Sequence, residues 1–129
     1  MTLRYGYTLF APIYDALVAP FTDAARRRSL ALLNEEPPLD ALLVGIGSGL
    51  DIPLLPPGPH YTGIDLTLAM LTRARRRAAA AGMAIHLDQG DARCLPYDDR
   101  AFDTVVLHLI LAVTPHPRQV LAEAARVLR

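Results

Sequence analysis

A chain of 129 residues, 52% of them apolar, can bury one hydrophobic core, so its length excludes two independent domains of ordinary size. Its formal net charge of +0 excludes the strong overall field expected of a nucleic-acid-binding domain. The single cysteine, Cys94, excludes an internal disulfide and a cysteine-rich zinc site. No signal-like segment opens the chain and no apolar run reaches the roughly 20 residues that span a bilayer, so we expect a cytoplasmic protein.

The first 38 residues predict a helical leader. Helical patterns run over Ile13–Val18 and Thr22–Leu33, and Pro20 separates them. We expect residues 1–38 to form this leader or a lid, and residues 39–129 to form the main domain.

The segment Ala41–Leu55 reads ALLVGIGSGLDIPLL and carries the strongest signal in the chain. Its apolar start predicts a buried strand, and Gly45, Gly47 and Gly49 then allow the backbone to turn sharply and approach a ligand closely. The amides at the start of the following helix would face that ligand. A plain turn is the alternative. Several prolines downstream leave room for only a short helix.

Glycine spacing separates two nucleotide-binding interpretations. The dinucleotide fingerprint is G-x-G-x-x-G, whereas this chain has G-x-G-x-G with Leu50 in the sixth position, which weakens an NAD interpretation. The next strand, Tyr61–Ile64, ends in Asp65, which lies about 20 residues past the first glycine, where a carboxylate accepts hydrogen bonds from ribose hydroxyls. These features predict an adenosine-containing ligand; a solvated helix-capping Asp65 is the alternative.

A surface helix is predicted over Leu68–Ala81, with Thr67 as its N-cap and Gly82 as its end. The residues expected to face the sheet are Leu68, Leu71 and Ala74. Thr67 and Met70 also suit a pocket lining, although Thr as a cap and Met as core filler are equally good interpretations.

Two further strands and a final helix follow. We predict strands over Ala84–Leu87 and Ala101–Leu109, then a helix over Pro117–Leu128 in which Leu121, Ala125 and Leu128 recur at helical spacing. Asp91, after the third strand, would sit beside an adenine or satisfy only local amides. The alternation of strands and helices predicts an α/β fold, a three-layer Rossmann-like parallel sheet.

Four segments in this order resemble the motifs of class I S-adenosylmethionine-dependent methyltransferases: LLVGIGSG, YTGIDLTLAML, QGDARCLPYDDRAFDTVVLHLILAV and QVLAEAARVLR. Within that family the chain is similar to the ubiquinone/menaquinone and phosphatidylethanolamine methyltransferases, through GSGLDIPLLPPG, GIDLTLAML, Tyr14-Asp15 and Arg26–Arg28.

The resemblance implies S-adenosylmethionine as cofactor, S-adenosylhomocysteine as product, and a small-molecule or lipid acceptor. Gly45, Gly47 and Gly49 would hold the methionine end, Asp65 the ribose, and Asp91 with Ala92 the adenine. The remaining cofactor-binding positions implied are Leu66, Leu109 and Tyr14.

Two departures from the family stand out. The family commonly has an acidic residue where this chain has Leu43; either cofactor affinity is reduced, or Asp51 compensates from the helix start. The family also continues past a sequence like ARVLR into further strands, so the resemblance implies that C-terminal strands are missing. A fragment, a homodimer paired through the exposed sheet edge, and a truncated product are three accounts of this.

Three functions follow from these patterns. A methyltransferase is the first; a non-catalytic or truncated cofactor-binding or assembly module with the same fold is the second, and a fragment of an NAD-dependent oxidoreductase is the third. His108, in the fourth strand, is the candidate general base, although a satisfied core histidine is the commoner role of such a residue. The other histidines are too scattered for a metal site, so none is predicted.

Arginine runs at Arg26–Arg28 and at Arg73 with Arg75–Arg77 are typical of solvated helix faces. Peripheral membrane contact is the alternative, and the oily segment Leu107–Val113 would suit a lipophilic acceptor. A neutral chain with few aromatic residues lacks both the charge and the stacking surface for RNA, so no nucleic-acid partner is expected.

Overall fold

The computed structural model describes residues 24–33, 39–108, 110 and 114–129. The predicted helix Ile13–Val18 lies outside these residues, as do Tyr14 and Leu109. Residues 24–31 are helical, within the predicted span Thr22–Leu33. The elements that follow are β1 (Asp40–Val44), η1 (Ile52–Leu54), β2 (His60–Asp65), α2 (Leu68–Ala81), β3 (His86–Gln89), β4 (Thr104–Val106) and α4 (Pro117–Val127).

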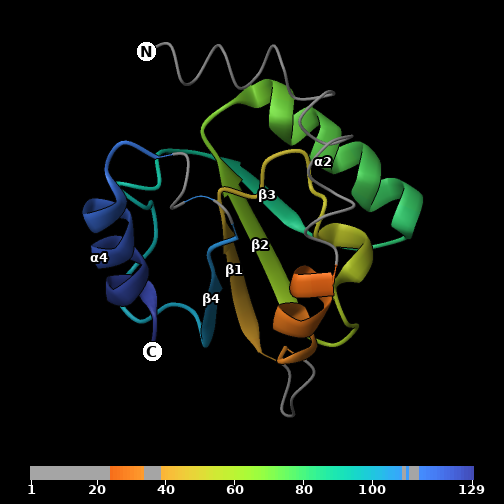
Figure 1. Cartoon of the computed structure of the whole chain (residues 1–129), viewed down its shortest axis with the longest axis horizontal. Helices are drawn as coiled ribbons and strands as arrows, with labels where there is room; N and C mark the ends of the chain where they lie inside the picture. The colour runs from red at the N-terminus through yellow and green to blue at the C-terminus, as the bar shows by residue number, and fades with distance from the viewer. Residues whose placement is uncertain (1–23, 34–38, 109, 111–113) are drawn as a thin grey trace.

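The four described strands form one parallel sheet in the order β3-β2-β1-β4. β1 lies at its centre, because it pairs with β2 along its whole length and with β4 through Ala41, Leu42 and Leu43. Helices cover both faces of the sheet in Figure 1, with α4 on one side and α2 with helix 24–31 on the other. The three-layer, Rossmann-like α/β prediction is therefore confirmed.

Alternate residues of β1 point into two separate cores. Leu43 packs among residues of helix 24–31, η1 and α2, and Leu42 packs on the opposite face beneath α4. Both leucines are almost completely buried, at 2% and 0% exposure, which is why the predicted strand is apolar at every position. One strand thus joins the two helical layers.

Two strand boundaries differ from the sequence prediction. β3 is His86–Gln89 and not Ala84–Leu87, because its ladder with β2 pairs His86 with Thr62 and Gln89 with Asp65. β4 is three residues long and not the predicted Ala101–Leu109. Its ladder with β1 ends opposite Leu43, one residue before β1 itself ends and turns into the glycine loop. A strand that continued beyond Leu107 would have no residue of β1 opposite it.

The faces that helices bury also differ in part. Leu71 and Ala74 of α2 face the sheet as predicted, but Leu68 is 57% exposed and Met70 takes its place in the core. In α4 the buried residues are Val120, Ala124 and Val127, whereas Leu121 and Leu128 are exposed. The predicted and the observed set of α4 both repeat at helical spacing and are offset by one position, so helical periodicity alone cannot distinguish them.

Glycine at position 49 should be more important to folding than glycine at position 82. Both have positive φ, +84 and +63 degrees, so alanine is strained at either site by about 1 to 2 kcal/mol. A Cβ on Gly82 meets nothing within 4 Å, whereas one on Gly49 would lie 3.1 Å from Ala74 Cα and 2.7 Å from Ile52 Cδ1. We expect Gly49→Ala to lose a further 1 to 3 kcal/mol, roughly, of unfolding free energy in urea titrations. Equal losses for both variants would contradict the packing role of Gly49.

Candidate functional site

The residues singled out in the sequence gather at one edge of the sheet. The glycine loop follows β1, Asp65 ends β2, Asp91 lies just beyond β3, and His108 lies just beyond β4. Because all four strands run parallel, their carboxyl ends share this edge, where ligands bind in open α/β sheets.

The glycine loop is held against the end of β2. Gly45 N and Ile46 N both donate to Ile64 O, at 2.9 and 3.1 Å. All three loop glycines have positive φ, at 66, 60 and 84 degrees for Gly45, Gly47 and Gly49. The sharp turn predicted for these residues is therefore present.

The absence of a side chain at two of these glycines is required by the protein's own packing. A Cβ on Gly45 would lie 2.7 Å from Ile110 Cδ1, and one on Gly49 would meet Ile52 and Ala74. Packing is thus a second reason for glycine at both positions, and the ligand-binding role of the loop backbone stays a prediction.

Asp65 is a buried carboxylate at the end of β2, with 8% exposure. Oδ1 accepts a hydrogen bond from Gly47 N at 3.1 Å, and Oδ2 accepts from Thr67 N at 3.0 Å and from Thr67 Oγ1 at 3.3 Å. Burial raises the pKa of this carboxyl above its ordinary value, against the opposing effect of these hydrogen bonds. The solvated alternative for Asp65 is excluded.

The backbone N–H of Leu66 also faces this carboxylate, so loop, strand end and helix start all donate to it. Thr67 occupies the N-cap position of α2 as predicted, but its hydroxyl makes no cap hydrogen bond and instead donates to Asp65. Met70, at 1% exposure, is core and not pocket lining.

Asp91 makes local contacts with Arg93. Its carboxylate accepts from Arg93 N at 2.9 Å and from the guanidinium Nε and Nη2 of the same residue at 3.0 and 2.7 Å. The hydrogen bond from the Arg93 side chain holds the pKa of Asp91 below its usual value. Gly90 N donates to Asp65 O at 2.9 Å, which keeps this turn beside the end of β2. The adenine roles of Asp91 and the adjacent Ala92 stay predictions, as does the role of Leu66, which is 42% exposed.

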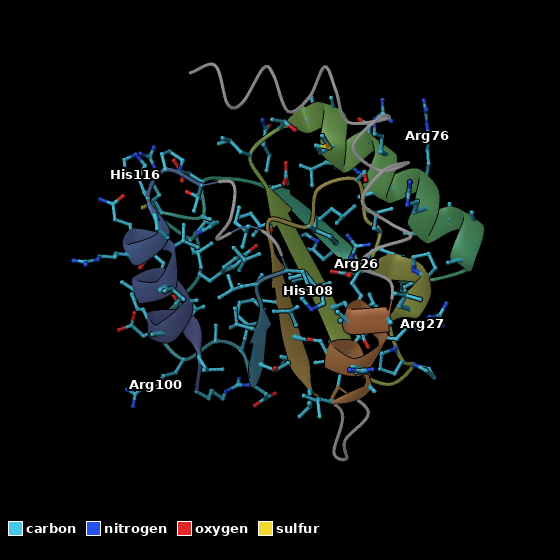
Figure 2. All side chains as sticks on the ribbon, in the orientation of Figure 1. Arg26, Arg27, Arg76, Arg100, His108 and His116 are labelled. Atoms are coloured by element: carbon cyan, nitrogen blue, oxygen red, sulfur yellow. The ribbon has the colours of Figure 1, made fainter. Side chains whose placement is uncertain are left out.

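His108 lies in a polar cluster on the β1–β4 side of the loop. His108 Nδ1 is 2.9 Å from Asp51 Oδ2, and His108 Nε2 is 2.8 Å from Ser29 Oγ. Arg26 Nε approaches Asp51 Oδ1 at 3.3 Å. Figure 2 shows Arg26 and His108 between helix 24–31 and the sheet.

Sequence reasoning did not identify Ser29 as part of the site and named Asp51 only as a substitute for an acidic residue at position 43. The partners of His108 are 57 and 79 positions away along the chain, so no local pattern joins them. The sequence signal that could have pointed to this cluster is a polar residue among apolar ones, Ser29 in ARRRSLALL and His108 in LHLIL. Among the described residues no group of His, Cys, Asp or Glu is arranged to hold a metal ion.

Comparison with known proteins identifies the family. A methyltransferase domain model matches residues 42–129. The chain belongs to this methyltransferase domain family. It is 40% identical over 119 residues to a phosphatidylethanolamine N-methyltransferase of Cereibacter sphaeroides, an alignment that covers 91% of this chain and 58% of that protein.

A second relative belongs to the same family, and a solved structure shares the fold. The chain is 33% identical over 130 aligned positions to a demethylmenaquinone methyltransferase of Thermus thermophilus, covering 95% of this chain and 59% of the relative. The YcgJ protein of Bacillus subtilis superimposes with a TM-score of 0.76 at 24% identity, over 83% of this chain and 47% of that one. The methyltransferase domain described here thus spans a little over half the length of these two curated relatives.

Replacing Asp65 by Asn should destabilise the methyltransferase domain. The amide keeps one acceptor oxygen, but its NH2 group would face donors, either both Thr67 donors or Gly47 N. We expect Asp65→Asn to lose about 1 to 3 kcal/mol of unfolding free energy in urea titrations at neutral pH. Burial disfavours the charged form of Asp65 and raises its pKa, so we attribute the expected loss of stability to the lost hydrogen bonds and not to the lost charge. A variant as stable as the wild type would contradict this.

Proposed function

We propose that this methyltransferase domain binds S-adenosylmethionine and transfers its methyl group to a small or lipophilic acceptor. The single observation that carries the proposal is the buried Asp65 carboxylate, which lies at the carboxyl edge of a parallel sheet and is hydrogen-bonded to Gly47 of the loop. The family match supports the same reading.

The residues present fit the cofactor. A ribose offers two neighbouring hydroxyl donors, and Asp65 is an acceptor fixed in place by backbone and side-chain donors. The positive-φ glycine loop presents backbone beside it. The rest of S-adenosylmethionine, its sulfonium and its α-amino acid group, would extend over the glycine loop toward β4.

Each residue has a separate proposed role. When bound, S-adenosylmethionine supplies an electrophilic methyl group on a sulfonium. Asp65 and Leu66 bind and orient the ribose, Asp91 and Ala92 border the adenine, and the loop of Gly45, Gly47 and Gly49 positions the methionine side. Holding the acceptor in line with the methyl group can lower the barrier by about 7 to 11 kcal/mol in favourable cases, so positioning is the main task of the protein.

His108 is the proposed proton acceptor. Asp51 only accepts hydrogen bonds when ionised, so Nδ1 of His108 carries the proton of that contact and Nε2 of the neutral ring is left as a basic lone pair. The Ser29 hydroxyl donates to Nε2 of His108. In this proposal the methyl acceptor either takes the place of that hydroxyl beside Nε2 or passes its proton to His108 through it. Tyr14 and Leu109, outside the described residues, keep their proposed places in the pocket.

A quinone precursor or a phospholipid amine is the proposed acceptor. The support is the activity of the two relatives, a phosphatidylethanolamine N-methyltransferase and a demethylmenaquinone methyltransferase. Helix α2 carries arginine as its only charged residue type, which supports peripheral contact with an anionic membrane. No helix in the described ranges is long and apolar enough to cross a membrane. β4 is the last described strand on its side of the sheet, which supports pairing of two copies there.

Titration calorimetry with S-adenosylhomocysteine tests cofactor binding. We expect binding by the wild type and a loss on the order of 10- to 100-fold in Asp65→Ala, because charge-assisted hydrogen bonds to the ribose disappear. Asp98→Ala, at an exposed loop position, is the matched control and should bind normally. A folded wild-type sample that fails to bind would refute the proposal.

Transfer of labelled methyl groups then tests the acceptor. Demethylmenaquinone and vesicles containing phosphatidylethanolamine are the two substrates to compare. Methylation of either supports the enzyme reading and names the class. Cofactor binding without transfer to either would instead favour the non-catalytic binding module.

A further inference from the structure

Asp51 has a buried oxygen without a hydrogen-bond partner. The residue is 7% exposed, and Oδ2 is engaged by His108. Oδ1 lies 3.3 Å from Arg26 Nε, but it accepts no hydrogen bond from any described residue, so the two groups attract as charges without an aligned bond. Buried carboxylate oxygens are normally paired, so this atom indicates a donor that the described residues do not supply.

The position of Asp51 indicates which donor is missing. In the sheet order β3-β2-β1-β4, Asp65 ends β2 on one side of the glycine loop, and His108, the partner of Asp51, follows β4 on the other. Two strand spacings separate β2 from β4, about 10 Å. A ligand whose sugar lies at Asp65 and which extends across the loop therefore brings its far end to Asp51.

The far end of S-adenosylmethionine is an α-amino acid, with one ammonium and one carboxylate. Arg26 and Asp51 form a buried pair of opposite charges, with side chains 8% and 9% exposed. A zwitterion adds one charge of each sign, so the ammonium can meet Asp51 while the carboxylate meets the guanidinium, and the four charges alternate in sign.

We propose that Asp51 and Arg26 bind the amino acid end of the cofactor, with Asp51 Oδ1 accepting the α-ammonium and the Arg26 guanidinium holding the α-carboxylate. His108 keeps Asp51 oriented through Oδ2 and so leaves Oδ1 for the ligand. This inference rests on the proposed function, because it assumes that the sugar is bound at Asp65. It also assigns a ligand-binding task to helix 24–31, which carries Arg26.

The test compares two ligands by titration calorimetry. S-adenosylhomocysteine has the amino acid group, and 5′-methylthioadenosine has the same adenosine and thioether without it. Asp51→Asn keeps an oxygen that can accept from His108 but removes the charge that meets the ammonium. We expect this variant to bind S-adenosylhomocysteine on the order of 10- to 100-fold more weakly and to bind 5′-methylthioadenosine like the wild type. Asp98→Asn is the matched control and should change neither affinity.

A third ligand separates the two proposed contacts. The decarboxylated analogue of S-adenosylhomocysteine keeps the amine and lacks the carboxylate. Arg26→Met should weaken S-adenosylhomocysteine but not this analogue, whereas Asp51→Asn should weaken both. The reverse pattern would overturn the assignment of the two groups.

The outcomes distinguish this inference from the proposed function. If the wild type binds neither S-adenosylhomocysteine nor 5′-methylthioadenosine, the proposed function fails and the inference falls with it. If the wild type binds both but Asp51→Asn weakens them equally, or weakens neither, the adenosine site stands and the role of Asp51 is overturned.

Discussion

The carboxylate of Asp65 is the contact on which this edge of the molecule depends. It accepts from Gly47 in the loop after β1 and from Thr67 at the start of α2, so one buried group joins a strand end, a turn and a helix start. Burial opposes its charge, and the donors around it compensate. A group held in this way is rigid before any ligand arrives, which reduces the entropy lost on binding.

The remainder of the site follows from strand order. The central position of β1 places the glycine loop between Asp65 on one side and the cluster of Asp51, His108 and Ser29 on the other. One side is suited to neutral hydroxyl groups and the other, through Arg26 and Asp51, to a pair of opposite charges. An elongated ligand with a sugar at one end and a zwitterion at the other matches this division.

Local patterns predicted the parts of the fold that local chemistry determines. The strand Ala41–Val44 and the helix Leu68–Ala81 were predictable, because the first is buried on both faces and the second ends at a left-handed glycine. The length of β4 and the register of β3 were not, since both depend on where a neighbouring strand ends. The contacts of His108 were also out of reach, because its partners come from distant parts of the chain.

Helix 24–31 is anchored too firmly to act as a freely swinging cover. Leu30, within it, is 0% exposed and Leu33, just after it, is 3% exposed, and both belong to the core beneath η1 and α2. Exposing two such leucines costs about 3 to 6 kcal/mol, so the detached form would be a rare excursion, roughly one molecule in 10² to 10⁴. Ligand exchange at the carboxyl ends of β1 and β2 should therefore proceed with this helix in place, and not by its detachment.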